Sequence, residues 1–355
     1  MLPARHGDCL WVEYGRGRDV HRILVDGGPV STFEFIDKRL QQLPPGDRAF
    51  ELIVLTHVDA DHVEGVVRLF AEHPLPFTVD HVWFNGWRQM KKAHGLLGPL
   101  QGEFFSALLA ERVPQAWDCD AEPWVVPSVG KLPTQTLEGG MKLTLLSPRP
   151  AELRRMASAW KAAMQKDGIV PGNLAAAWKA LAQTRKFLPK KGLLGSAPDL
   201  DSLLKKQIPT DQAVPNGSSI AFLAEYEGKS ALFLADAHPD VISSSIERLR
   251  RERGVEKLRV GVVKVAHHGS KHNTNNTELV QLDSPSYLIS TNGDQFKHPD
   301  KECIARILRV GRAQRLYFNY RTRFTEPWLK KGPQKKYCYS AIVRAPDDLT
   351  MGIAL

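Results

Sequence analysis

The stretch THVDADHVEG, residues 56–65, directly follows the apolar run ELIVL, residues 51–55. The apolar run predicts a buried strand, and the polar stretch predicts a loop at its end. That loop carries two imidazoles and two carboxylates within six residues: His57, Asp59, Asp61 and His62. One histidine or aspartate at a strand end is usually a cap or turn residue, but four ligand-type side chains together indicate a metal site. We expect the first histidine–aspartate pair to face one ion and the second pair to face another.

Polar loops rich in acids and imidazoles follow other predicted strands as well. They are Asp26-Gly27-Gly28, Asp236-Ala237-His238 and the loop from His267 to Lys271, with His298 after the next strand. Because such loops gather at one rim of a sheet, their side chains can converge on one or two divalent cations. Ions of this kind generate hydroxide near neutral pH and stabilise both the attacking and the leaving oxygen.

The composition is that of a globular protein, with 355 residues of which 43% are hydrophobic and 25% charged. No apolar run approaches the roughly 18 to 20 residues of a membrane span, and the N-terminal residues lack the apolar core of a secretion signal. We therefore expect a cytoplasmic protein that does not enter a membrane. The four cysteines, at positions 9, 119, 303 and 338, include no CxxC pair and are expected to be reduced and structural.

The hydrophobic pattern predicts strands with helices interspersed. A hairpin opens the chain within its first thirty residues, and WVVPSVG, residues 124–130, reads as one of several further short strands. Between about residues 149 and 210 the pattern changes to two Ala-rich helices. We interpret residues 1–355 as a single α/β domain, with a helical, basic insertion at 149–213 and a basic, aromatic C-terminal segment at 312–355.

The net charge of +9 is concentrated in two segments. Residues 149–210 contain twelve Lys/Arg against four Asp/Glu, and residues 312–336 contain eight against the single Glu326. Such runs are usually solvated surfaces, but clustered cations also bind polyanions by releasing counterions from phosphates. In the second segment aromatic residues alternate with the cations, as in proteins that bind single-stranded nucleic acid. The inward face of two terminal strands would supply the same aromatic residues.

These motifs, in this order, resemble the metallo-β-lactamase superfamily, and most closely the soluble hydrolase part of its ComEC/Rec2 branch. The stretch from His57 to His62 matches HxDxDH, the variant in that branch of the superfamily motif HxHxDH. HGDCLWVEY looks like the opening GQGD strand of the branch, and Asp26 looks like the early aspartate of the superfamily. Asp236 looks like the bridging carboxylate, VVKVAHHGS resembles the KxxHHGS loop, and His298 resembles the histidine of the GHP element.

The resemblance implies a metallo-β-lactamase-like αββα sandwich that binds one or two divalent ions. The implied metal ligands are His57, Asp59, Asp61, His62, Asp236 and His267. Strand alternation would point His267 and His268 to opposite sides, so we expect the first to bind metal and the second to act as an acid or phosphate contact. His298 is expected beside it as a second catalytic side chain.

Two departures from the family pattern concern the first metal position. Asp59 stands where the family usually has a second histidine. The histidine that the family usually has before the penultimate hairpin is also absent, and Asn216 is the nearest candidate to replace it. Harder oxygen ligands favour manganese or magnesium, whereas the remaining imidazoles still suit zinc.

Three functions remain open at this point. The first is a metal-dependent phosphodiesterase or nuclease, with nucleic acid or another phosphodiester as substrate. The second is a hydrolase of a small ester, such as a phosphocholine-like or cyclic-nucleotide substrate. The third is a polyanion-binding protein whose altered first site no longer supports catalysis. A two-metal site accommodates either of the first two chemistries, so the motif by itself does not choose the substrate.

Overall fold

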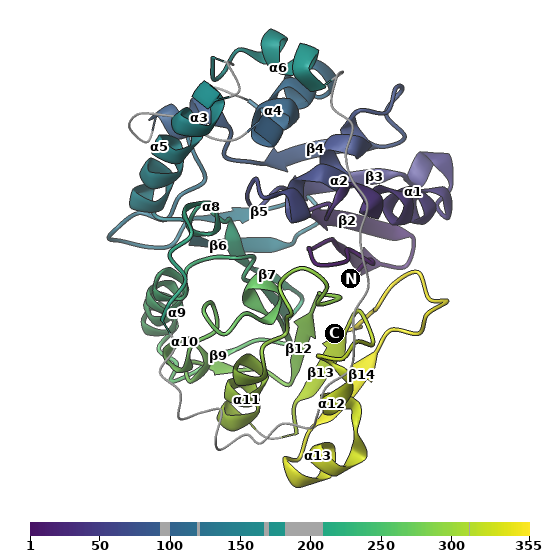
Figure 1. Ribbon diagram of the computed structural model, residues 1–355, viewed down its shortest axis with the longest axis vertical. Coiled ribbons are helices and arrows are strands. Elements are labelled where there is room, and N and C mark those ends of the chain that lie inside the picture. Colours follow the sequence, from purple (N-terminus) through teal and green to yellow (C-terminus); the bar gives the residue numbers. More distant parts are fainter. Residues whose placement is uncertain (93–99, 119–120, 167–169, 182–208, 312) are drawn as a thin grey trace.

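Two β-sheets pack face to face in the computed structural model, and helices cover their outer faces (Figure 1). The structure describes residues 1–355 except 93–99, 119–120, 167–169, 182–208 and 312. The αββα sandwich expected from the sequence is therefore confirmed.

The first sheet has the order β1-β2-β3-β4. Its strands are β1 (Leu10–Arg16), β2 (Asp19–Val25), β3 (Ala49–Val54) and β4 (Thr78–Trp83). In the β1–β2 hairpin Arg16 pairs with Asp19, so the turn has only two residues, and Gly17 supplies the positive φ of 61° that such a turn favours. Strands β2, β3 and β4 are parallel, so their carboxyl ends lie at one edge.

The second sheet has eight strands in the order β14-β13-β12-β10-β8-β7-β6-β5. They are β5 (Thr134–Thr136), β6 (Lys142–Ser147), β7 (Ala221–Tyr226), β8 (Lys229–Phe233), β10 (Val262–Lys264), β12 (Ser286–Ile289), β13 (Arg315–Phe318) and β14 (Ser340–Val343). From β8 through β10, β12 and β13 to β14 neighbouring strands pair in parallel, and from β5 to β8 they pair antiparallel. A separate pair joins β9 (Leu258–Arg259) to β11 (Leu282–Asp283).

The longer helices form the outer layers of the sandwich. They are α1 (Phe33–Gln41), α2 (Ala60–Phe70), α4 (Leu100–Arg112), α5 (Pro150–Lys166), α9 (Pro239–Arg253) and α11 (Lys301–Val310). Shorter helical pieces are η1 (Val30–Thr32), η2 (Pro45–Asp47), α3 (Trp87–Lys92), α6 (Leu174–Leu181), α8 (Val214–Gly217), η3 (Ala266–Gly269), α10 (Asn276–Leu279), α12 (Glu326–Leu329) and α13 (Lys331–Lys336). Helix α9 has Pro239 in its first turn, arginines in its last turn and a left-handed Gly254 after it, which is the expected order of start and stop residues.

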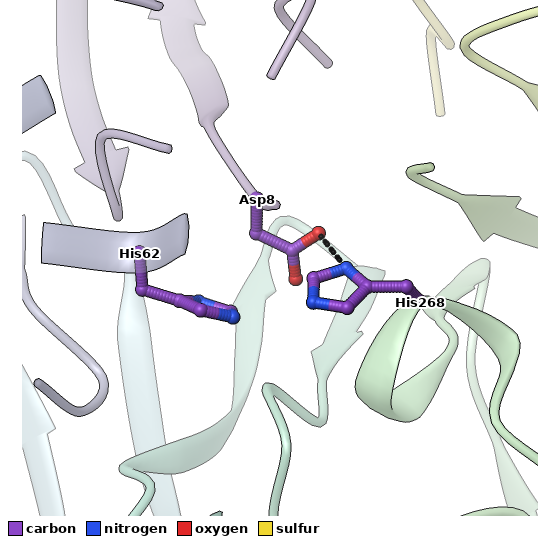
Figure 2. A group of neighbouring side chains, drawn as sticks. All are labelled: Asp8, His62 and His268. Atoms are coloured by element: carbon purple, nitrogen blue, oxygen red, sulfur yellow. Dashed lines mark ion pairs between the residues drawn. The ribbon is translucent and has the colours of Figure 1, made fainter. Parts of the chain in front are cut away.

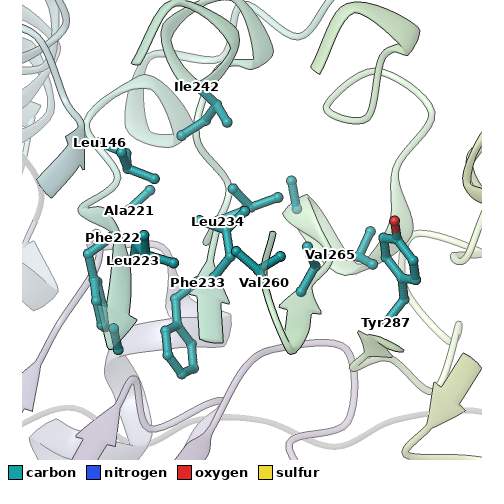
Figure 3. Close-up of a cluster of buried hydrophobic side chains, with 14 of the residues drawn as sticks. Leu146, Ala221, Phe222, Leu223, Phe233, Leu234, Ile242, Val260, Val265 and Tyr287 are labelled. Carbon is teal, nitrogen blue, oxygen red and sulfur yellow. The ribbon is translucent and has the colours of Figure 1, made fainter. Parts of the chain in front are cut away.

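Alternating side chains of the first sheet serve two cores. Ile23 and Leu52 face the second sheet, whereas Leu24 and Ile53 pack with the helices on the outer side. From the second sheet, Phe222 and Phe233 point toward the first sheet and stack with ring centroids 4.9 Å apart (Figure 3). This alternation is the period-two pattern of strands buried on both faces.

The structure corrects one predicted strand. Residues 124–130 form no strand and β5 begins only at Thr134. Proline cannot donate to a strand ladder; Pro123 directly precedes this run and Pro127 lies within it. Val126 instead donates a single hydrogen bond of 2.7 Å to the carbonyl oxygen of Pro148.

Two charged segments had been predicted from the sequence. Helices α5 and α6 lie where Ala-rich helices were predicted, but Lys190, Lys191, Lys205 and Lys206 fall outside the described residues. In the C-terminal segment Phe318 and Trp328 are fully buried and Tyr317 and Tyr339 nearly so, so these rings serve the core.

Among the described residues, no helix combines the length and apolar character that crossing a bilayer demands. The division of the chain into a domain with an insertion stays a prediction.

Glu278 is a buried acid in α10, which packs between α9 and α11. Burial raises the pKa of its carboxyl group from 4.5 to about 8, against the opposing effects of the Asn275 backbone and Arg306. The folded protein therefore holds this proton more tightly than the unfolded chain does. Its contribution to stability is complete below pH 4.5 and is lost as the pH rises to about 8.

We predict that Glu278→Gln removes this loss, because glutamine keeps the shape of the side chain and does not titrate. From about pH 5 to about pH 9, the unfolding free energy of the wild type should fall by about 2 to 4 kcal/mol relative to the variant. Urea unfolding in a series of buffers measures this difference. A difference that stays constant across the series would contradict the prediction.

Candidate metal centre

The centre lies where the carboxyl ends of β2 and β3 meet those of β8 and β10. The two sheets are joined at this edge by a hydrogen bond of 2.9 Å from the Ile220 amide to the Thr56 carbonyl oxygen. The predicted loop after β3 is shorter than expected. Asp59 is the extended N-cap of α2, so Asp61 and His62 lie in the first turn of that helix. An acid in a first helical turn is favoured by the helix dipole.

Asp26, which directly follows β2, fixes the ring of His62. Its carboxylate accepts hydrogen bonds of 2.8 Å each from the amide and the hydroxyl of Thr56. It also lies 2.8 Å from His62 Nδ1. A proton on Nδ1 then leaves Nε2 of His62 free to bind a cation, which is the usual role of a carboxylate behind a metal-binding histidine.

Asp236, three residues after Phe233 at the end of β8, is the centre of the arrangement. One oxygen of its carboxylate lies near the Nε2 atoms of four histidines. The distances from Asp236 Oδ2 are 4.0 Å to His57, 3.6 Å to His62, 3.5 Å to His267 and 3.7 Å to His268. The side chain is 3% exposed. Histidines from two segments, residues 57–62 and 267–268, thus converge on a single carboxylate oxygen.

His268 is completely buried, and Figure 2 shows its ring facing the carboxylate of Asp8. Its Nδ1 lies 3.2 Å from Asp8 Oδ1 and 3.1 Å from the Ser290 carbonyl oxygen, and its Nε2 lies 3.4 Å from Asp61 Oδ2. Asp8 also pairs with the buried Lys264, with 2.5 Å between Nζ and Oδ2. The loop that carries Asp8 fits closely against α2, because a Cβ on Gly7 would lie only 1.8 Å from the Asp61 carbonyl oxygen.

His267 is held by a different set of polar groups. Its Nδ1 lies 2.8 Å from Asn273 Oδ1 and 3.5 Å from Asp211 Oδ2. The Asn273 amide nitrogen in turn donates to Asp211 Oδ2 at 2.7 Å and to the Asp236 carbonyl oxygen at 3.1 Å. Asn216 also donates to Asp211, at 2.8 Å. The Nε2 atom of His267 is therefore the one that faces Asp236.

The residues present fit a divalent cation. Four of their buried polar atoms have no hydrogen-bond partner in the described residues: His57 Nε2, His62 Nε2, His268 Nε2 and Asp236 Oδ1. Two groups within this cluster have ligand atoms close enough to share an ion, namely Asp8, His62 and His268, and His57, His62 and Asp236. Buried polar atoms are rarely left without partners, so this set of atoms suits a bound cation.

The electrostatics of the protein alone also call for positive charge. Burial lowers the pKa of His57 to about 3, which keeps that imidazole neutral. For His268 burial opposes protonation, but Asp236 and Asp8 outweigh it and raise the pKa to about 10. Burial likewise opposes protonation of His62, yet Asp236 and Asp26 hold its pKa well above the ordinary value. Protons on imidazoles here offset the same carboxylate charge that a cation would offset.

The structure brings together all six side chains that the sequence named as metal ligands. The argument from strand alternation was wrong, because β10 ends at Lys264 and both His267 and His268 have left-handed backbone angles in η3. His298 lies at the rim, with its ring 5.7 Å from that of His267. The sequence did not single out Asp8, Asp211 or Asn273 as site residues. Asp8 lies in a recognised motif, but the other two carry no local signal.

Comparison with known proteins leaves the family open. No family model matches the chain, and no curated protein matches it. Among solved structures it is similar to the CmlA beta-hydroxylase E377D mutant, with a TM-score of 0.34 and 13% sequence identity. The match covers 94% of this chain and 52% of that one, so the chain spans about half the length of this structure.

We predict that Asp8 and Lys264 are strongly coupled. Lys264→Met leaves the buried carboxylate of Asp8 without the ammonium group of Lys264 and should lower the unfolding free energy by about 3 kcal/mol. The double variant Asp8→Asn/Lys264→Met should lose about 2 kcal/mol less than the two single variants together. Urea unfolding of the metal-free proteins measures both quantities. Additive losses would show that the pair does not act as a unit.

Proposed function

We propose that the protein is a metal-dependent hydrolase of the metallo-β-lactamase superfamily that cleaves phosphodiesters with two divalent cations. The observation that carries this proposal is the single carboxylate oxygen of Asp236 within 4.0 Å of four imidazole nitrogens. A carboxylate with histidines on several sides is suited to bridging two ions. The HxDxDH stretch and the αββα sandwich agree with this assignment.

We assign both neighbouring histidines as ligands, one to each ion. The first position would use His57, Asp59, His267 and Asp236, and the second Asp61, His62, His268 and Asp236. His268 is assigned to metal binding and not to acid catalysis because it is wholly buried and its Nε2 has no other partner in the described residues. Asn216 is left out because its amide nitrogen donates to Asp211. His267 takes the place of the missing family histidine.

The ligand set mixes imidazoles and carboxylates in both positions. Imidazole suits zinc, and carboxylate suits manganese and magnesium. With His267 as a ligand the first position gains a nitrogen donor, which favours zinc or manganese over magnesium. Asp59, whose side chain is 40% exposed, remains the most accessible ligand, so we expect the first position to exchange its ion more readily.

The chain's own residues divide the remaining tasks of hydrolysis. Divalent cations bound here would lower the pKa of a coordinated water toward neutrality and stabilise negative charge on phosphoryl oxygens. Asp26 and Asn273 hold the rings of His62 and His267, so that Nε2 of each faces the centre. His298 lies at the rim, 3.4 Å from Asp300 through its Nδ1, and its Nε2 would pass a proton to the leaving oxygen.

We predict that Asp61→Ala or His62→Ala lowers kcat/KM for bis-p-nitrophenyl phosphate at least about 100-fold, because each removes a ligand of the second position. His267→Ala and His268→Ala should each reduce the bound metal from two equivalents to one. Elemental analysis after dialysis against limiting zinc or manganese measures metal content independently of activity. His81→Ala, on β4, is the matched control and should retain both ions. Near-wild-type turnover in Asp61→Ala would remove this residue from the mechanism.

A nucleic-acid substrate is the second candidate, favoured by the basic C-terminal segment. However, the lysines of α13 lie at the wrong edge of the sheet. The Ala313 amide bonds to the Cys338 carbonyl oxygen, and Ser340 pairs with Arg315 at the start of β13. Helix α13 therefore lies near the amino ends of β13 and β14, whereas the metal centre lies at the carboxyl ends.

We predict that charge reversal at Lys330, Lys331, Lys335 and Lys336 leaves hydrolysis of a small phosphodiester unchanged. If these lysines contact phosphates, each contact would contribute about 0.7 to the log–log salt slope of single-strand binding. Because these lysines lie far from the carboxyl ends of the strands, we expect the salt slope of the charge-reversal variant to equal that of the wild type. Binding measured by fluorescence anisotropy across a salt series tests this. A slope reduced by about 2 or more would support a nucleic-acid path over α13 and the nuclease alternative.

A further inference from the structure

Phe296 is an exposed aromatic ring at the edge of the metal centre. It lies in the loop between β12 and α11 and is 42% exposed. Every other phenylalanine or tryptophan whose side chain the structure describes is at least half-buried. An isolated exposed apolar side chain is ordinary, but this one lies among the polar residues of the candidate site.

The ring of Phe296 is surrounded by three imidazoles. The ring centroids lie 6.1 Å from His298, in a stacked arrangement, 6.3 Å from His267 and 6.0 Å from His6. His267 is also 3.5 Å from Asp236. An aromatic face next to a metal ligand is within reach of a substrate whose phosphate lies at the centre.

The loop that carries Phe296 is held in place by the rest of the fold. The Asn292 amide donates to the Arg5 carbonyl oxygen at 2.7 Å, and the Lys297 amide donates to that of Gly293 at 3.1 Å. Gly293 leaves no room for a side chain, because its Cβ would lie 2.3 Å from the ring of Phe324. These contacts fix the position of the loop that carries the exposed ring.

The charges around Phe296 restrict which ligands suit it. Arg5, next to His6, and Lys297, next to Phe296, are both exposed. Aromatic faces bind quaternary ammonium groups well, but two neighbouring cations oppose such a group. They favour an anionic substrate that also carries a flat, neutral ring, and nucleobases stack on aromatic side chains whatever their sequence.

We propose that Phe296 is a stacking platform for the base of a nucleotide phosphodiester, so that the substrate is a nucleotide ester and not a choline-type ester. The proposal rests on the proposed function for the position of the phosphate. With this platform the site includes residues that bind no metal. They lie in the loop between β12 and α11 and in the N-terminal loop that carries His6. Substrate selection is then carried by residues that bind no ion.

The test compares two substrates that share a leaving group, thymidine 5′-(p-nitrophenyl phosphate) and methyl p-nitrophenyl phosphate. Phe296→Ala should lower kcat/KM for the thymidine ester about 10-fold, which corresponds to about 1.4 kcal/mol, since it removes the aromatic face on which the base stacks. It should change the methyl ester less than about 2-fold. Phe296→Trp should restore most of the loss. Ile342→Ala, on β14 and equally exposed at 42%, is the control and should affect neither.

Binding of thymidine 5′-monophosphate to the metal-loaded protein, measured by calorimetry, gives a readout that does not need turnover. Phe296→Ala should weaken it about 10-fold. Unchanged binding, or an equal loss of kcat/KM on both esters, overturns the platform. If the wild type cleaves neither ester while retaining its metal, the proposed function fails, and the calorimetric comparison still decides whether Phe296 stacks a base.

Discussion

The carboxylate of Asp236 is the constraint on which the rest of the site depends. A buried carboxylate is costly unless positive charge or hydrogen-bond donors surround it, and here four imidazoles do so. Those imidazoles come from both sheets of the sandwich. The two layers must therefore stay in register at this edge for the charge to remain compensated, and the Ile220 to Thr56 hydrogen bond joins them within a few residues of the centre.

Around this carboxylate, three of the four imidazoles are each oriented by a second polar group. Asp26 orients His62, Asp8 faces His268, and Asn273 orients His267. In each case this polar group lies close to Nδ1 of the histidine, so Nε2 of the same ring faces Asp236. Three independent contacts of the same kind are difficult to explain as core packing alone, because a purely structural histidine would use both ring nitrogens. This regularity supports a metal centre more strongly than any single distance.

The two ends of the site differ in character. On the α2 side His57, His62 and His268 are completely buried, so that part of the centre is shielded from solvent. Toward the β12–α11 loop the side chains become accessible, with His267 at 20% and Phe296 at 42% exposure. Under the proposed function, we expect a substrate to approach from this accessible side. Arg5 and Lys297 are exposed there and would contact it.

The sequence by itself determined most of the strands and most of the longer helices, because apolar runs and the polar residues after them are local patterns. The motifs in the same loops predicted six metal ligands, and the structure brings these six side chains together. Local pattern failed at WVVPSVG, where one proline before the run and one within it prevent a ladder, and at His267-His268, where the chain has already left the strand. Only the tertiary structure decided that Asp8, Asp211 and Asn273 belong to the site. The physical reason is that Asp8 reaches Lys264 across 256 positions of the chain and Asp211 reaches Asn273 across 62, and such contacts leave no trace in the spacing of neighbouring residues.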